Sequence, residues 1–303
     1  EYLGQGVGVK HYGSGNYCPI LSMSSGDEFA DVPIPTWEDW ARTADAASFS
    51  SSYRNRVPKD YSFDPCKWEE KKDTAVFRGA STGMGITPEK NPRLMLASMA
   101  KNDARLDAGI TSFNFRPRIV RAQDGKAIVD LPDPAVLGID TVSPMSPREQ
   151  ARYKYIINVE GHACAFRLTS ELAYGSVVLL AKTKSKMWVT DALRDGVHYV
   201  GIKADMSDLR EKLDWCQAHD AECKEIAGNA RKFYEKHCVR SGILDYLQSI
   251  LVKLKKRTGS YQYNCVTAMG VIESLEKKIL NEIPSVTSTE GKLIRKSRST
   301  LVH

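Results

Sequence analysis

The sequence lacks a long apolar run and any closely spaced pair of cysteines. No stretch approaches the roughly 18 consecutive apolar residues of a membrane span, and no basic segment followed by an apolar core marks a signal peptide. The seven cysteines form neither a Cys-x-x-Cys pair nor a Cys/His cluster with zinc spacing. The sequence therefore predicts no membrane span in this chain, no metal site and no required disulfide.

Also missing are a block of like charges, an Asn-x-Ser/Thr sequon and a Gly-x-Gly-x-x-Gly fingerprint after a strand. The net charge of +6 is spread along the chain, which favours anionic ligands and disfavours a dedicated nucleic-acid binder. The missing fingerprint disfavours a Rossmann-type oxidoreductase. We expect a soluble protein, either cytoplasmic or the luminal part of a secretory-pathway enzyme. Because the chain does not begin with Met, we also expect residues upstream of Glu1.

Strands and helices alternate through the middle of the chain. The apolar run at 74–77 predicts a buried strand, followed by a Gly/Ser/Thr loop and a helix near 88–101. Residues 119–133 read as β structure through a turn at Asp124-Gly125. Later runs predict strands at 155–159, 176–181 and 198–202, and helices near 166–174, 208–218 and 221–237. This alternation predicts an α/β fold with a parallel sheet covered on both faces.

The two ends of the chain differ from this middle. Residues 1–69 are rich in Gly, Ser, Pro and aromatics and are too few for an independent domain. Helices are predicted at 243–254 and 266–280, with a basic turn between them, and residues 284–303 are predicted to be disordered. Cys216 and Cys223 are seven positions apart in a helical stretch, which would separate them by roughly 10 Å along the axis, too far for a mutual bridge.

Two strand–glycine–loop junctions are candidates for phosphate binding. One is Arg78-Gly79 with the loop to Gly85, and the other is the Gly161–Arg167 segment, where small residues allow close approach of the backbone. Backbone N–H groups at such junctions attract phosphate, and two arginines converging on a diphosphate would stabilise a departing nucleotide. Each junction alone is equally consistent with simple turn formation.

Read together, four strings resemble the capsule-associated xylosyltransferases and protein O-glucosyltransferases of glycosyltransferase family 90. They are PTWEDW, AVFRGASTG with PEKNPRL, YKYIINVEGHACAFRLTSELAYGSVVLL, and VHYVGIKADMSDLREKL. The order and spacing of the family pattern match over roughly residues 17–240. The resemblance implies a GT-B fold with a Rossmann-like donor domain at 70–258 and a truncated N-terminal acceptor-side domain at 1–69. A C-terminal helix at 259–283 and the tail at 284–303 complete the expected organisation.

The resemblance also implies an activity. The chain would be an inverting, metal-independent glycosyltransferase that moves xylose or glucose from UDP-xylose or UDP-glucose to a hydroxyl of a glycan or glycoprotein, with no cofactor required. Arg78 and Arg167 look like the diphosphate clamp, and Trp37 and Trp40 match an aromatic segment beside sugar and acceptor. The residues implied to line the donor loops are Gly79, Ser81, Thr82, Gly161, His162, Ala163, Cys164, Ala165 and Phe166. The alternative is an inactive relic that binds a nucleotide sugar or glycan.

The sequence departs from the family pattern at several points. Ala165 stands where a small polar residue is usual, Glu160 where an Arg-like residue is usual, and about three extra residues follow Gly83. An inverting transfer needs a carboxylate to take the acceptor proton, and counting back places the family's base near or before Glu1. The acids inside the segment, Asp27, Glu28, Asp31 and Asp39, are expected to be solvated, so the base is unassigned.

Three further residues keep two interpretations each. His162 either binds the diphosphate or is an exposed residue at a helix start. His198 is more simply a structural histidine than a ligand. Glu171 would lie one helical turn beyond the phosphates and could accept hydrogen bonds from the ribose, although the family pattern is not acidic there.

Overall fold

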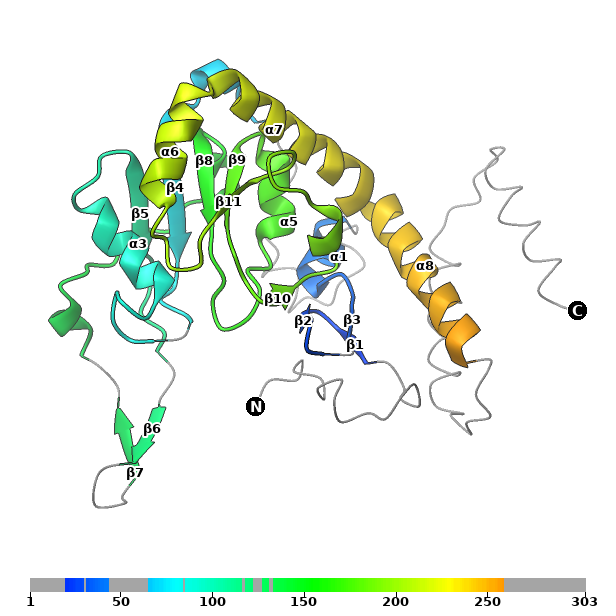
Figure 1. The fold of residues 1–303 in the computed structure, drawn as a ribbon, viewed down its shortest axis with the longest axis horizontal. Helices are drawn as coiled ribbons and strands as arrows, with labels where there is room; N and C mark the ends of the chain where they lie inside the picture. The colour runs from blue at the N-terminus through cyan, green and yellow to red at the C-terminus, as the bar shows by residue number, and fades with distance from the viewer. Residues whose placement is uncertain are drawn as a thin grey trace, which may run out of the picture. The chain divides into compact units, whose positions relative to one another are not determined.

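The computed structural model describes residues 20–29, 31–43, 65–83, 85–115, 118–121, 127–130 and 133–258, which are the coloured parts of Figure 1. The helix predicted at 266–280 and the disorder predicted at 284–303 lie outside the described residues. The chain divides into two units, Glu1–Ile243 and Leu244–His303. The described part of the second unit is helical.

A five-stranded sheet forms the centre of the first unit. Its strands run in the order β11 (Val200–Ile202), β9 (Val177–Ala181), β8 (Tyr153–Asn158), β4 (Lys72–Gly79) and β5 (Leu106–Ile110), visible side by side in Figure 1. Every neighbouring pair is parallel, which confirms the predicted α/β class. The sequence did not predict β5, because Asp107 and Gly109 interrupt the apolar pattern of a buried strand.

Helices connect and cover these strands. The β4–β5 connection contains α3 (Pro92–Ala100), and α4 (Pro147–Gln150) leads into β8. After β8 come α5 (Leu168–Glu171) and the 3₁₀ turn η5 (Leu172–Tyr174), and after β11 come α6 (Leu209–Ala218), α7 (Asp220–Phe233), the π turn η7 (Tyr234–Cys238) and α8 (Arg240–Thr258). The helices predicted within the described residues are thus found in position, although the one expected at 166–174 is a short α-helix followed by a 3₁₀ turn. The exception is α8, which continues through residues 255–258, where a turn was expected.

The remaining elements are short. Three further 3₁₀ turns are η3 (Trp68–Glu70), η4 (Pro134–Leu137) and η6 (Thr190–Ala192). Strands β6 (Arg118–Arg121) and β7 (Ala127–Asp130) form the expected antiparallel pair. In the N-terminal segment, β1 (Leu21–Ser22) pairs with β3 (Val32–Pro33), β2 (Ser25–Gly26) pairs with β10 (Ser185–Lys186), and α1 (Trp37–Thr43) follows. The β2–β10 pair joins this segment to the loop that follows β9.

Side-chain alternation along the strands separates two hydrophobic clusters. Phe77 and Tyr155 belong to the larger cluster, together with apolar residues of α3, α6 and α7. Their neighbours Val76 and Ile156 belong to the smaller one with Tyr174 of η5. Successive strand residues point to opposite faces, so helical residues cover both faces of the sheet, as predicted.

The corner between α6 and α7 overturns the expected separation of two cysteines. The helix ends at Ala218 and a new one begins at Asp220, because His219 has a non-helical backbone. The chain turns there, and the Cys223 thiol donates to the Cys216 carbonyl at 3.5 Å, with both residues buried. The estimate of 10 Å assumed one continuous helix and is wrong for that reason.

The strand order places a topological switch point between β4 and β8. From β4 the chain crosses to β5 on one side, and from β8 it crosses to β9 on the other. In sequence order the sheet reads 2-1-3-4-5, and ligands of such sheets bind at the carboxyl ends of the strands where the order reverses. The two loops singled out in the sequence follow β4 and β8.

Lys71 ties the amino ends of three strands together. It is buried, and its ammonium donates to the Ala151 carbonyl, to the Tyr174 carbonyl at 3.0 Å and to Ser176 Oγ at 3.1 Å. These acceptors lie just before β8 and β9, and Lys71 itself precedes β4. A buried cation with three acceptors is stable only while all of them stay in place.

We expect Lys71→Ala to lower the free energy of unfolding by about 2–4 kcal/mol, because buried carbonyl and hydroxyl oxygens lose their donor. Urea denaturation measures the change. Lys67→Ala, at an exposed position four residues away, is the control and should change stability by less than about 0.5 kcal/mol. Equal effects of the two substitutions would contradict the role of Lys71.

Candidate functional site

Arg93 links the carboxyl ends of β4 and β8. Its Nε donates to the Glu160 carbonyl at 3.0 Å, and its Nη2 donates to the Val159 carbonyl at 2.9 Å. Its Nη1 donates to the Ala80 carbonyl at 3.1 Å and to Thr82 Oγ1 at 2.8 Å. Arg93 was not predicted to belong to the site, although it lies in the PEKNPRL string that carries the resemblance.

Asn91 and His162 hold the same two loops. Asn91 caps α3 by accepting from the Arg93 N–H at 3.0 Å, and its amide donates to the carbonyls of Ser81 at 3.0 Å and Gly85 at 3.1 Å. His162 Nδ1 accepts from the Gly83 N–H at 3.2 Å. His162 therefore joins the β4 loop to the β8 loop, while its expected contact with a diphosphate stays a prediction.

A side chain would be crowded at Gly79, the last residue of β4, and at Gly161, three residues after β8. A Cβ at Gly79 would lie 3.2 Å from Arg167 Nη1 and 3.3 Å from Arg93 Nη1. A Cβ at Gly161 would lie 2.5 Å from Thr82 Oγ1 and 3.1 Å from Arg93 Nη2. Two guanidinium groups thus approach the backbone where a side chain would exclude them.

Arg167 is held from three directions. Its Nη1 donates to the Arg78 carbonyl at 3.0 Å, and its guanidinium carbon lies 5.0 Å from the centre of the Phe77 ring. Its Nε lies 2.8 Å from Glu171 Oε1. The side chain remains 28 % exposed, and its Nη2 has no partner among the described residues. Arg167 therefore offers one guanidinium edge outward at the switch point.

The expected convergence of the Arg78 and Arg167 side chains is wrong for this structure. The Arg78 guanidinium donates to the Asp107 carbonyl at 2.6 Å and forms an ion pair with the Asp107 carboxylate. Phe77 and Arg78 are neighbours on a strand, so their side chains point to opposite faces, and Arg167 packs on Phe77. It is the Arg78 carbonyl that meets Arg167, while a role for the Arg78 side chain in donor binding stays a prediction.

Ser81 supports its loop from within. Its N–H donates to the Ser112 carbonyl at 3.0 Å, its hydroxyl accepts from the Asn114 N–H at 2.8 Å, and its side chain is buried. The expected contact between Ser81 and a donor substrate stays a prediction. Thr82 is partly exposed and bonded to Arg93.

The β8 loop presents backbone N–H groups. In the described part of the chain, the amides of Ala163, Ala165 and Phe166 donate to no protein group. Cys164 Sγ lies 3.0 Å from Ser24 Oγ, and burial raises the pKa of this thiol. The contact with Ser24 places the N-terminal segment against the loop.

Glu171 does not face a ribose, contrary to one expectation. Its side chain is 1 % exposed, and Oε2 accepts from Asn158 Nδ2 at 2.6 Å while Oε1 faces Arg167. Burial raises the pKa of Glu171 against the opposing effect of Arg167.

His198, by contrast, is structural as expected, because it accepts from the Arg194 N–H and packs against Phe233.

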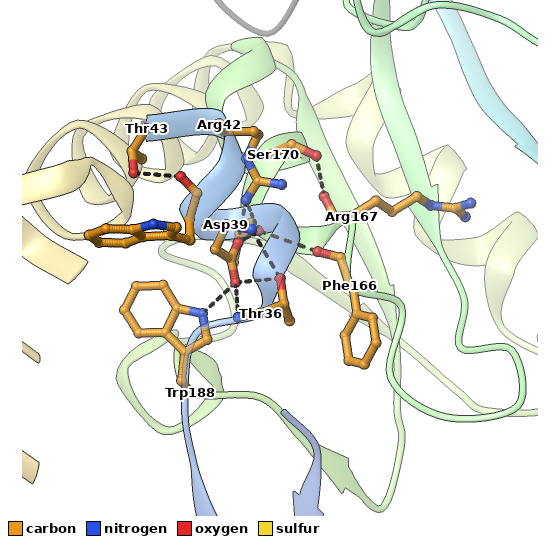
Figure 2. A network of polar contacts seen from close by, with 10 residues as sticks. Thr36, Asp39, Arg42, Thr43, Phe166, Arg167, Ser170 and Trp188 are labelled. Atoms are coloured by element: carbon orange, nitrogen blue, oxygen red, sulfur yellow. Dashed lines mark hydrogen bonds and ion pairs between the residues drawn. The ribbon is translucent and has the colours of Figure 1, made fainter. Parts of the chain in front are cut away.

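Asp39 fastens α1 to α5, as Figure 2 shows. Its Oδ2 accepts from the Thr36 N–H at 2.8 Å, the Thr36 hydroxyl at 2.9 Å and Trp188 Nε1 at 3.0 Å. Its Oδ1 accepts from Thr169 Oγ1 and pairs with Arg42. Five donors fill the roughly four lone-pair sites of a carboxylate, so Asp39 is structural and has no position left for a substrate proton.

The other acids of this segment differ in exposure. Asp27 is 81 % exposed and pairs with Lys186, and Glu28 is exposed. Asp31 is 7 % exposed. The expectation that all four acids are solvated is therefore wrong for Asp31 and Asp39, because the segment folds against α5 and the loops that follow β8 and β9.

Of the two tryptophans, Trp37 is exposed, while Trp40 is partly buried beneath the guanidinium of Arg240.

Comparison with known proteins assigns a family to this arrangement. A family model described as glycosyl transferase family 90 matches residues 8–279, which is most of the chain. The chain belongs to glycosyl transferase family 90. The resemblance inferred from the four strings is thereby confirmed, and the switch-point loops of this family 90 chain are the segments that carried it.

Relatives of the family 90 chain include viral and animal proteins. Uncharacterized protein 179R of Invertebrate iridescent virus 6 is 40 % identical over 274 residues, which cover 78 % of this chain and 23 % of that protein. Human protein O-glucosyltransferase 1 is 26 % identical over 273 residues, covering 88 % of this chain and 63 % of that protein. The chain thus spans about a quarter of the viral relative.

Among solved structures, Anabaena Alr3699/HepE in complex with UDP-glucose matches at 13 % identity and a TM-score of 0.38, over 60 % of this chain and 48 % of that one.

Within the described ranges, no helix is both long and apolar enough for a membrane crossing. The same residues contain no group of three His, Cys, Asp or Glu side chains placed to hold a metal ion.

We expect Asp39→Ala to lower the free energy of unfolding by about 3–5 kcal/mol, because it leaves the buried Arg42 charge uncompensated. Thermal or urea denaturation measures the loss. Asp27→Ala removes an equal charge from the surface of the same segment and should cost less than about 1 kcal/mol. A small effect at Asp39 would show that α1 is not held by this network.

Proposed function

We propose that this family 90 chain binds a UDP-sugar at the β4–β8 switch point and transfers xylose or glucose to a hydroxyl of a glycan or glycoprotein, inverting the anomeric carbon. The observation that carries the proposal is the outward guanidinium edge of Arg167, held at the carboxyl ends of two adjacent parallel strands. In this proposal the α/β unit is the donor half of a GT-B enzyme.

Metal-independent binding is part of the proposal. Arg167 can make charge-assisted hydrogen bonds to a diphosphate, and the unengaged amides of Ala163, Ala165 and Phe166 add neutral donors. Arg93 lies beneath the same loops and contributes positive charge without an outward edge. As the bond to the sugar breaks, charge develops on the departing UDP, and fixed donors stabilise it there.

The acceptor side is assigned to the N-terminal segment. It contacts the donor loop through Ser24 and Cys164 and pairs with the β9 loop through β2 and β10. Exposed Trp37 offers an aromatic surface suited to a sugar or peptide. Asp39 accepts five hydrogen bonds and Asp27 lies in a surface ion pair, so neither is proposed as the general base. Of the other acids of residues 27–39, which are exposed Glu28, half-buried Glu38 and buried Asp31, we propose Asp31 for the first test.

An inactive relic that only binds the nucleotide sugar is the alternative. It shares the Arg93 and Arg167 geometry, so donor binding alone does not separate the two. A base that takes the acceptor proton does, since an inverting transfer depends on it.

Donor binding is tested with Arg167. We expect UDP to bind the wild-type chain in calorimetry with EDTA present, and Arg167→Ala to lower turnover of UDP-glucose or UDP-xylose by about 10²–10³-fold. The melting temperature should fall as well, because the substitution leaves the buried Glu171 carboxylate without its cation, so turnover is compared at a temperature at which both proteins are folded. Arg210→Ala, an exposed arginine on α6, is the control. Binding that requires added metal would contradict the metal-free proposal.

The base is tested with Asp31. We expect Asp31→Asn to keep UDP affinity and to lower transfer by about 10²–10⁴-fold, because the acceptor proton loses its base. Asp27→Asn serves as the matched control and should retain full turnover. Normal transfer by Asp31→Asn would place the base elsewhere, and transfer that is absent from wild type with UDP binding intact would favour the relic.

A further inference from the structure

The Arg167 guanidinium owes its orientation to a buried carboxylate. Glu171 lies one helical turn after Arg167, and its Oε1 is 2.8 Å from Arg167 Nε. Its Oε2 accepts from Asn158 at the end of β8 at 2.6 Å, and Asn158 is itself buried. The carboxylate is thus anchored to the sheet on one side and holds the arginine on the other.

The contacts of Arg167 determine the direction of its outward guanidinium edge, which is Nη2. Nε forms a close ion pair with Glu171 Oε1 that lacks hydrogen-bond geometry, Nη1 donates to the Arg78 carbonyl, and the Phe77 ring covers one face of the guanidinium. Because a guanidinium is planar, fixing Nε and Nη1 also fixes Nη2. Without Glu171 the side chain would pivot about its remaining contacts, and the outward edge would no longer have one direction.

Burying Glu171 is costly in itself. A carboxylate removed from water loses hydration energy that an ion pair only partly restores. The groups facing it are Arg167 from its own segment, Asn158 from β8 and Arg93 from α3. Arg93 and Arg167 repel each other, and Glu171 offsets that repulsion, which allows two guanidinium groups to lie on either side of Gly79.

We infer that Glu171 is a positioning residue that, anchored by Asn158, orients Arg167 to bind the donor diphosphate. The inference rests on the proposed function, since it concerns the same diphosphate site. The change in donor affinity expected on removal of Glu171 has the opposite sign to that of a pure charge effect. Removing a nearby negative charge would by itself strengthen the binding of an anion, whereas loss of orientation weakens it.

The test measures the affinity of UDP-glucose at pH 8 for wild type, Glu171→Gln, Glu171→Asp and the control Glu225→Gln on the exposed side of α7. We expect Glu171→Gln to bind at least about tenfold more weakly and to lower kcat, because it loses the ionised partner. Glu171→Asp keeps the charge but is too short to reach both Arg167 and Asn158, so it should weaken binding as well. The control should match wild type.

A pH series on wild type gives a second measurement that needs no variant to fold. Burial raises the pKa of Glu171, so it takes up a proton at a higher pH than an exposed Glu, and affinity should fall as the pH is lowered from 8 through the range in which Glu171 becomes protonated. UDP-glucose is the probe because it lacks the terminal phosphate of UDP, whose second pKa is near 6. Glu171→Gln should show no such fall.

The outcomes separate the two proposals. Wild type that fails to bind UDP-glucose overturns the proposed function and this inference with it. UDP-glucose binding that stays equal or becomes tighter in Glu171→Gln overturns the role of Glu171 alone. Weaker binding by both Glu171 variants, with a fall at acid pH only in wild type, supports the inference.

Discussion

The site depends above all on the hydrogen bonds of Arg93. Where β4 and β8 diverge, their carbonyls lose the partners that the sheet provides, and unpaired buried carbonyls are costly. The planar guanidinium of Arg93 supplies donors to Ala80, Val159 and Glu160 at once. Burial and the nearby Arg167 lower the pKa of Arg93 to about 9, which shows how much hydration it gives up. Lys could not replace it, since one ammonium cannot reach acceptors on two loops.

A similar arrangement closes the opposite end of the sheet. Lys71 binds the backbone before β8 and β9 as Arg93 binds the backbone after β4 and β8. Two buried cations thus fix the central strands at both ends. Because a parallel sheet pairs only along the strands, these links determine how rigidly its loops are held. The switch-point geometry follows from them more than from the loops' own sequences.

The short helix α5 connects the two sides of the site. Thr169 binds Asp39, and two positions later Glu171 binds Arg167. Both carboxylates are buried, and each compensates a guanidinium, Arg42 in one case and Arg167 in the other. One turn of helix therefore places the N-terminal segment and the arginine of the donor loop in a fixed relation. A shift of α5 would move both.

The sequence by itself determined four strands of the central sheet, the helices α3, α5, α6, α7 and α8, the two glycine loops and the family, because these depend on apolar periodicity and on short strings of adjacent residues. It did not predict α1, α4 or the short strands of the N-terminal segment. It missed β5, whose Asp107 and Gly109 face neighbours that only the folded sheet supplies. Side-chain direction was likewise decided by the tertiary structure. Arg78 turns to Asp107, Asp39 and Glu171 are buried, and Cys216 meets Cys223 across a helix break at His219. A charged residue in a sequence carries no mark of the groups that will bind it, and such a group can lie as far along the chain as Trp188 does from Asp39.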